Sequence, residues 1–198
     1  MNPDLPAFAR IVDPLPYEDR LEARPLGQID LVVIHCTELP DLAMAREYGE
    51  RILHASGTGN CGHYYIDRDG SVHVYVRPAR IAHHVRGYNP RSVGIELVNT
   101  GRYPHWLATG SQRMEEPYTD AQIASLHALL ADLQRELPNL RFIAGHEDLD
   151  TACEPASDDP DVLVRRKMDP GPLFPWDAVL RTTPLERLLP QPPVTGRL

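Results

Sequence analysis

Two histidines and one aspartate, distant from one another along the chain, have the residue types of ligands for a single metal ion. His35 follows an apolar run at residues 31–34 and His146 follows a second run at residues 142–145, so both are expected at the ends of buried strands. Asp169 lies in a Met-Asp-Pro-Gly-Pro turn that is too rich in proline for a helix or a central strand. Two imidazoles and one carboxylate leave the fourth position of a tetrahedral zinc ion open to water, as in a catalytic zinc site. The sequence therefore indicates such a site, provided that the three segments meet.

Each of these residues also has an ordinary structural explanation. A histidine at a strand end is often just a polar residue with satisfied hydrogen bonds, and an aspartate before Pro-Gly is normally a turn residue. Glu96, inside the apolar strand expected at residues 92–98, is harder to explain, because an unpaired buried carboxylate costs free energy. Lys167 follows two arginines and would ordinarily belong to a solvated charged segment. The functional interpretation depends on all of these residues occurring together.

Length, charge and hydropathy limit the class of protein. A chain of 198 residues suits one domain with a core of its own. Its 28 acidic and 20 basic residues give a net charge of -8, and no basic stripe offers to neutralise phosphates, which argues against nucleic acid as a partner. No apolar run has the length of a membrane span, and the first residues lack the basic and apolar regions of a secretory signal. We therefore expect a cytoplasmic protein without membrane partners.

The cysteines do not suggest a second kind of chemistry. Cys36, Cys61 and Cys153 are odd in number and include no C-x-x-C pair, which favours free thiols over a disulfide framework or a thiolate zinc site. Cys36 adjoins His35, but side chains alternate along a strand, so it should point to the opposite face. A cysteine nucleophile is therefore not expected.

Strands and helices alternate irregularly through the middle of the chain. A capping box at residues 119–122 begins a helix that ends near Leu137, and Asp41 is placed to cap a helix that runs to about His54. Residues 67–70 form the turn of a hairpin. Short apolar runs give expected strands at 30–35, 63–66, 72–76, 92–98 and 140–145, with a short helix at 176–180. The pattern predicts one α/β (α+β) domain in which helices flank a central mixed sheet.

Composition divides the chain into three parts. Residues 1–29 carry five prolines and no sustained period, and are expected to form an extended N-terminal arm. The domain itself is expected at residues 30–181, followed by a proline-rich C-terminal tail at 182–198. Within the domain, residues 147–168 place seven carboxylates in their first fifteen positions, so we expect this segment to be a mobile, solvated loop.

Seven short segments match segments of one known family, and they occur in the same order. They are V-I-H-C at 33–36, G-H-Y-Y-I-D-R-D-G at 62–70, A-H-H at 82–84, S-V-G-I-E-L at 92–97, Y-T-D-A-Q at 118–122, A-G-H at 144–146 and K-M-D-P-G-P-L-F at 167–174. With these segments the chain resembles the zinc-dependent N-acetylmuramoyl-L-alanine amidases, and especially the AmpD-type enzymes of peptidoglycan recycling. Phage lysozyme-amidases and peptidoglycan recognition proteins are wider relatives, and the resemblance implies their fold.

The resemblance also implies roles for individual residues. By position it makes His35, His146 and Asp169 the ligands of one zinc ion per chain, with no other cofactor. It makes Glu96 the general acid/base and places Lys167 near the oxyanion that develops in the reaction. An aspartate as the third ligand, where the phage and recognition-protein relatives use cysteine, points to the recycling branch.

Several positions depart from the family pattern. Gly62 stands where the phage relatives have a tyrosine, which leaves the acid/base role to Glu96. His83 replaces the tryptophan usual before the histidine that matches His84, and His84 itself is a candidate substrate-facing residue. Glu38, three residues after His35, is expected to be exposed. The change to His83, a shorter region between His35 and His63 and a longer one between His146 and Asp169 affect the shape of the pocket and the substrate preference rather than the chemistry.

Three functions remain to be compared. The first is an amidase that cuts the bond between the lactyl group of N-acetylmuramoyl, or of its 1,6-anhydro form, and L-alanine, in a monomer that recycles muropeptides. The second is a recognition module that binds peptidoglycan without cutting it, although such modules usually lack a zinc ligand. The third is a lysin or effector amidase that acts on intact cell wall. Other zinc hydrolases are disfavoured, because neither H-E-x-x-H nor the deaminase pairing of H-x-E with P-C-x-x-C occurs.

Overall fold

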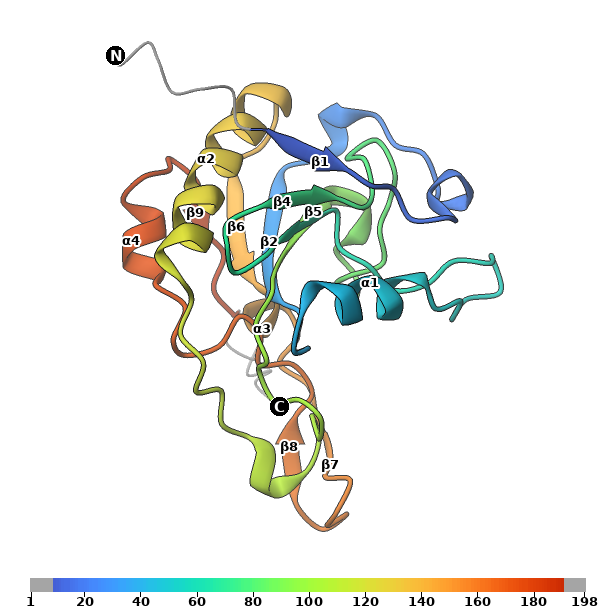
Figure 1. Ribbon diagram of the computed structural model, residues 1–198, viewed down its shortest axis with the longest axis vertical. Helices are drawn as coiled ribbons and strands as arrows, with labels where there is room; N and C mark the ends of the chain where they lie inside the picture. Colours follow the sequence, from blue (N-terminus) through green and yellow to red (C-terminus); the bar gives the residue numbers. More distant parts are fainter. Residues whose placement is uncertain (1–8, 191–198) are drawn as a thin grey trace, which may run out of the picture.

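The structure is a computed structural model that describes residues 9–190. Its centre is one seven-stranded sheet in the order β1-β4-β3-β5-β2-β6-β9 (Figure 1). All neighbouring strands are parallel except the hairpin β3–β4, so the predicted mixed sheet is confirmed. The strands are β1 (Arg10–Val12), β2 (Leu31–Cys36), β3 (Tyr64–Ile66), β4 (Val72–Val74), β5 (Ser92–Leu97), β6 (Phe142–Gly145) and β9 (Glu186–Arg187).

Helices flank this sheet, as the α/β prediction requires. The longest, α2 (Asp120–Glu136), begins at the predicted capping box: the Thr119 hydroxyl accepts from the Gln122 amide, and the Gln122 side chain accepts from the Thr119 amide. Its apolar face packs on the sheet through buried leucines at 126, 129, 130 and 133. The shorter helices are α1 (Leu42–Glu50), α3 (His146–Leu149) and α4 (Trp176–Leu180). None of the helices within residues 9–190 is long and apolar enough to span a lipid bilayer.

Helix α1 ends earlier than predicted. Asp41 caps it by accepting from the Met44 amide at 2.7 Å, but the helix stops at Glu50 and does not reach His54. The amides of Leu53 and His54 instead donate to the carbonyl of Thr58, which folds residues 51–60 into a loop. The prediction failed because apolar residues near helical spacing do not require a helix when the backbone finds other partners.

The folded unit extends beyond residues 30–181 in both directions. β1 pairs in parallel with β4, and Leu15, Tyr17 and Leu21 of the N-terminal segment are buried in a cluster with Tyr65 and Tyr75. At the other end, β9 adds to β6 and Leu185 is buried. Residues 1–8 of the expected arm and residues 191–198 of the expected tail lie outside the described residues.

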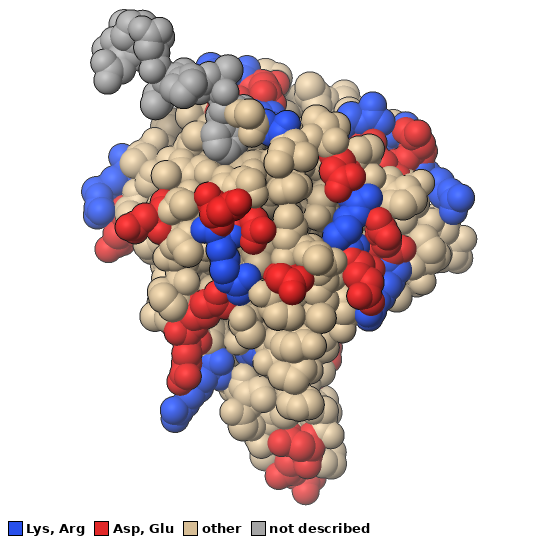
Figure 2. Space-filling view, in the orientation of Figure 1, with Lys and Arg blue, Asp and Glu red and all other residues tan. Residues whose placement is uncertain are grey.

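The acidic segment 147–168 contains regular secondary structure, so the prediction of a long loop is wrong. It contains α3 and an antiparallel hairpin, β7 (Cys153–Pro155) with β8 (Leu163–Arg165). This hairpin extends away from the sheet together with the 3-10 turn η4 (Thr109–Ser111) (Figure 1), and the two are joined by backbone and side-chain hydrogen bonds. On the face drawn in Figure 2, acidic side chains gather at the tip of this projection.

Side-chain alternation divides the sheet into a core face and a site face. The even-numbered Val32 and Ile34 of β2 pack with α2, as do Ile95 and Leu97 of β5. His35 therefore points to the other face, whereas the buried side chain of Cys36 contacts Tyr118. On that face the parallel register places Glu96 directly beside His35, and Gly145, the residue before His146, beside Ile34. The carboxyl ends of three parallel strands thus bring these groups together.

Candidate metal centre and active site

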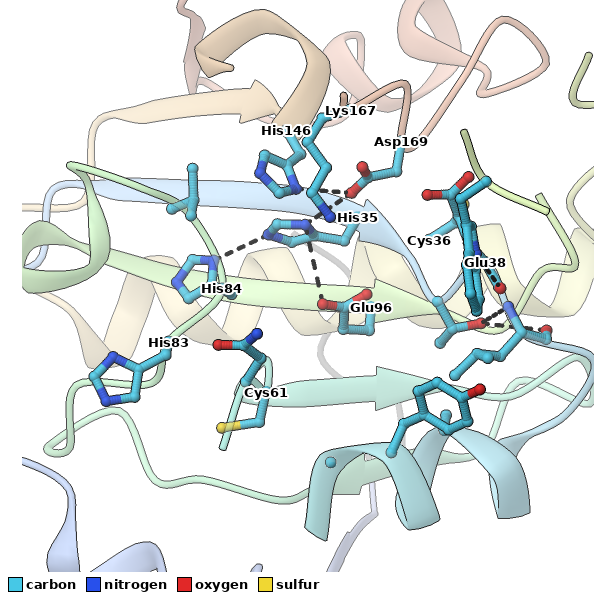
Figure 3. Close-up of a pocket in the computed structure, with 18 of the residues that line it drawn as sticks. His35, Cys36, Glu38, Cys61, His83, His84, Glu96, His146, Lys167 and Asp169 are labelled. Carbon is cyan, nitrogen blue, oxygen red and sulfur yellow. Dashed lines mark hydrogen bonds and ion pairs between the residues drawn. The ribbon is translucent and has the colours of Figure 1, made fainter. Parts of the chain in front are cut away.

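The three residues predicted as ligands converge at the carboxyl ends of β2 and β6. His35 is the penultimate residue of β2, His146 begins α3 directly after β6, and Asp169 lies in the loop after β8. Their nearest ligand atoms all lie within 4.8 Å of one another, and all three side chains are buried. Asp169 Oδ2 is 2.9 Å from His35 Nδ1 and 3.1 Å from His146 Nδ1 (Figure 3). His35, which is more than one hundred positions away from the other two residues, therefore forms one group with them that could hold a metal ion.

The donor set fits a divalent cation such as zinc. Asp169 Oδ1 is buried and has no hydrogen-bond partner among the described residues, although Oδ2 is shared by two imidazoles. Burial lowers the pKa of His35 to about 4, so its imidazole is neutral and has a lone pair for a metal. Burial alone would raise the pKa of Asp169, but the charge and hydrogen bond of His146 outweigh it, and the pKa lies well below its ordinary value. A neutral His35 and an ionised Asp169 are forms that bind zinc.

Glu96 faces this group from the neighbouring strand. Its Oε1 lies 3.9 Å from His35 Nδ1, and the side chain is largely buried. Burial, followed by the charge of Asp169, raises the pKa of Glu96 well above its ordinary value. Gly62 makes room for it, because a Cβ at position 62 would lie 2.7 Å from Glu96 Cγ. The glycine that departs from the phage pattern is thus the residue that accommodates the glutamate.

Lys167 supplies the positive charge of the site. It lines the same cavity, and its charge acts on His35, Glu96 and Asp169. Figure 3 shows its side chain running beside His146 toward His35. The lysine comes from the segment after β8, so the hairpin that sequence reasoning took for a loop positions it.

His84 lies against the ligand group rather than at the outer wall of the cavity. Its Nδ1 is 2.9 Å from His35 Nε2, and its Nε2 is 3.2 Å from the hydroxyl of Ser92. Both ring nitrogens therefore already have protein partners. The neighbouring His83 turns the other way and packs on His54, with ring centroids 4.6 Å apart.

A cavity of about 830 Å³ surrounds the group and is rimmed by cations. Arg51, Arg86 and Arg166 line it together with Lys167. Burial, and then the charge of Arg86, lowers the pKa of Arg166. Among the described residues Arg51 is paired with Glu47 and Arg166 with Asp150, so Arg86 and Lys167 are the lining cations left to attract an anionic ligand.

Sequence reasoning missed the ion pair behind this site. Glu38, expected to be exposed, is 6% exposed and binds the buried Arg102 through both carboxylate oxygens. Trp106, which also lines the cavity, donates its indole N–H to the carbonyl of Glu38. The one available signal was that Glu38 follows a buried strand end closely, where a charged side chain needs a partner.

These features define a class of protein: a single α/β fold with one candidate metal centre at the carboxyl ends of its parallel strands. Residues 25–172 match the family model Amidase_2, described as N-acetylmuramoyl-L-alanine amidase. Because this match covers most of the chain, the protein belongs to that family, and the resemblance identified from the sequence is confirmed.

Individual relatives match over part of their length. An uncharacterized protein from Haemophilus influenzae is 41% identical over 81 residues, which are 41% of this chain and 63% of that protein. The endolysin of Klebsiella phage KP32 is 31% identical over 91 residues, which are 46% of this chain and 56% of the endolysin. The match therefore spans somewhat more than half the length of these curated relatives.

Solved structures share the fold. The N-acetylmuramoyl-L-alanine amidase LysC from Clostridium intestinale superposes with a TM-score of 0.64 at 19% identity, over 90% of this chain and 99% of that one. AmpDh3 from Pseudomonas aeruginosa, in complex with an anhydromuramic pentapeptide, superposes with a TM-score of 0.60 at 21% identity, over 81% of this chain and 61% of that one. At these identities the comparison establishes the fold alone.

Proposed function

We propose that this protein is a zinc-dependent amidase that cleaves the amide bond between the lactyl group of N-acetylmuramoyl, or of its 1,6-anhydro form, and the L-alanine of a stem peptide. The observation that carries the proposal is the meeting of three candidate ligands with a buried carboxyl and a lysine in one cavity. Membership of the amidase family supports the same reaction.

His35, His146 and Asp169 would hold one zinc ion per chain. When bound, zinc lowers the pKa of water toward about 7 and polarises a carbonyl oxygen. The protein would contribute three fixed ligand positions in a largely buried site. Two strand ends and the loop after β8 place the ligands, so they would not need to reorganise when the metal binds.

Glu96 would move the proton. Hydrolysis of an amide needs a base that takes a proton from the attacking water and an acid that gives one to the leaving nitrogen. A carboxyl whose pKa is raised by burial binds a proton readily enough to deliver it again at neutral pH. Such acid/base work is typically worth about 10²–10⁴-fold in rate.

Lys167 would stabilise the negative charge that develops on the scissile carbonyl oxygen. Removal of one donor of this kind costs about 10²–10³-fold in rate in other hydrolases. Its charge also offsets that of Asp169 and of Glu96 when ionised, which would otherwise repel an acidic peptide.

The substrate would be a small muropeptide rather than intact wall. Arg86 and Lys167, which line the cavity, would attract the carboxylates of a stem peptide. An anhydromuramic peptide is the ligand of the AmpDh3 complex. The aspartate at position 169 is the feature that resembles the recycling branch. We infer a monomeric enzyme of muropeptide recycling, which would act in the cytoplasm.

The decisive experiment offers 1,6-anhydro-muropeptide and intact sacculi in parallel and analyses the products by mass spectrometry. We expect free stem peptide from the small substrate, and its loss in Glu96→Gln. Release from sacculi alone would indicate a lysin or effector amidase. Binding of the muropeptide without any product would indicate a recognition module.

A further inference from the structure

A continuous chain of hydrogen bonds runs from the candidate ligand His35 into the protein. His35 Nε2 lies 2.9 Å from His84 Nδ1, and His84 Nε2 lies 3.2 Å from the Ser92 hydroxyl. That hydroxyl in turn lies 2.9 Å from the backbone carbonyl of Tyr88. Ser92 is fully buried, so no water replaces these contacts.

The chain has four contacts, from Asp169 to the Tyr88 carbonyl, but only three protons, one each on His35, His84 and Ser92, so one contact must lack a proton. A carbonyl oxygen only accepts, so the single proton of the Ser92 hydroxyl points to Tyr88. His84 Nε2 must then carry the proton that it donates to Ser92, which leaves His84 Nδ1 as an acceptor. When a cation lies between His35 Nδ1 and Asp169 Oδ2, His35 Nε2 is therefore the donor to His84, and His35 Nδ1 bears the lone pair.

This tautomer is the one that a metal site requires. The lone pair on His35 Nδ1 faces Asp169 Oδ2 at 2.9 Å, and two acceptors this close are stabilised by a cation that both can bind. Metal-ligating histidines generally donate their other ring N–H to a fixed partner, which sets both the tautomer and the ring orientation. Here that partner is a second imidazole, where a carboxylate or a carbonyl is more usual.

Local sequence holds His84 in place. The side-chain oxygen of Asn89 accepts from the amides of both His84 and Val85, at 3.0 and 2.8 Å. Gly94 on β5 provides the space, because a Cβ there would lie 2.7 Å from His84 Nδ1. The ring edge of His63 closes the remaining side, with ring centroids 5.5 Å apart.

We propose that His84 and Ser92 are positioning residues that fix the ring of His35 with Nδ1 directed to the metal. The role is distinct from contact with substrate, since neither ring nitrogen of His84 is free. It rests on the metal site of the proposed function, but not on the amidase reaction.

Metal affinity tests this chain of hydrogen bonds, from His35 through His84 to Ser92, without any substrate. Zinc affinity is measured by competition with a chromophoric chelator, and geometry by the visible absorption of the cobalt(II)-substituted protein. We expect His84→Ala to weaken zinc binding about 10–100-fold and to change the cobalt spectrum. His84→Asn, whose Oδ1 can replace Nδ1 as acceptor, should recover much of the loss. Ser92→Ala, which removes only the outer acceptor, should give a smaller loss of the same kind.

His83→Ala is the matched control, because His83 is adjacent in sequence but contacts His54 instead of His35. It should leave zinc affinity and the cobalt spectrum unchanged, while circular dichroism verifies the fold of every variant. Unchanged zinc affinity in both His84→Ala and Ser92→Ala, or an equal loss in His83→Ala, would overturn the proposal. If zinc binding depends on His84 but the protein releases no stem peptide, the amidase function would be refuted and the positioning role of His84 would stand.

Discussion

Arg102 and Glu38 form a buried, two-pronged ion pair that connects the two halves of the site. Arg102 Nε donates to one carboxylate oxygen of Glu38 at 2.7 Å, and a terminal nitrogen donates to the other at 3.0 Å. The same guanidinium donates to the backbone carbonyls of Arg165 and Arg166, the two residues before Lys167. The segment that follows β2 and the segment that carries Lys167 are therefore held by one side chain.

Removal of one partner should be costly. We expect Arg102→Met to lower the free energy of unfolding by about 3–5 kcal/mol, because it leaves the Glu38 carboxylate buried without its cation. Urea denaturation measures this value. The control is Arg51→Ala, which breaks the exposed pair with Glu47 on α1 and should leave the free energy of unfolding nearly unchanged. Similar costs for the two variants would show that the buried pair contributes no more than a surface one.

Metal binding should depend on each of the three candidate ligands. We expect the purified protein to hold about one zinc ion per chain and His146→Ala to lose both the metal and turnover. Elemental analysis after gel filtration measures the stoichiometry. His127→Ala, which alters a partly buried histidine of α2 away from the cavity, should retain the metal. Full turnover by metal-free protein in excess chelator would rule out the zinc mechanism.

Much of this site could be predicted from sequence because strand ends have a recognisable pattern. An apolar run followed by His, in a parallel sheet, places His35 and His146 at one edge, and alternation along β5 places Glu96 on the same face. The pairing of Glu38 with Arg102 was not predictable in this way. The two residues are 64 positions apart, and no periodic pattern connects a buried charge to its partner.

The hairpin β7–β8 shows a second limit of sequence reasoning. Its strands have only three residues each, which is too short for apolar alternation to identify them. They form because their main chains pair with each other, while Val164 and Ala156 are buried and Arg166 pairs with Asp150. The high acidic content of the segment predicted a mobile loop. The sequence does not show the partners of this segment, because tertiary contacts supply them.

Lys167 should act on turnover and not on metal retention. We expect Lys167→Ala to reduce kcat by about 10²-fold or more, since the developing oxyanion loses its cation, while the zinc content stays at about one per chain. Steady-state kinetics with 1,6-anhydro-muropeptide and elemental analysis of the same sample test both parts. Arg113→Ala, an exposed cation outside the cavity lining, serves as the control for overall charge. A near-wild-type kcat would remove Lys167 from the mechanism.

Gly62 should be required because of the space it leaves for Glu96. We expect Gly62→Ala to displace the glutamate, since the new Cβ would lie 2.7 Å from Glu96 Cγ, and to lower kcat without loss of zinc. The matched control is Gly110→Ala, where no atom lies within 4 Å of the added Cβ. Equal activity of the two variants would mean that the position of Glu96 tolerates the displacement.

The hydrogen bonds that join the hairpin β7–β8 to segment 99–118 should weaken in acid. Asp158 accepts from the amide of Thr109 at 2.8 Å and from its hydroxyl at 2.9 Å. The amide hydrogen bond, which dominates, holds the pKa of Asp158 below its ordinary value despite some desolvation. A carboxyl whose pKa is lower in the folded than in the unfolded protein stabilises the folded state at pH values above its unfolded pKa. This stabilisation is lost as pH falls through the folded pKa.

The amide NMR signal of Thr109 reports this titration directly. We expect its chemical shift to remain constant at neutral pH and to move in acid, with a midpoint below the ordinary pKa of an aspartate, which is about 3.9. Asp158→Asn keeps an oxygen that can accept from the amide but does not titrate, so the acid transition should disappear. A midpoint at or above the ordinary value, or a transition that persists in Asp158→Asn, would show that Thr109 responds to another group and that Asp158 does not join the two segments.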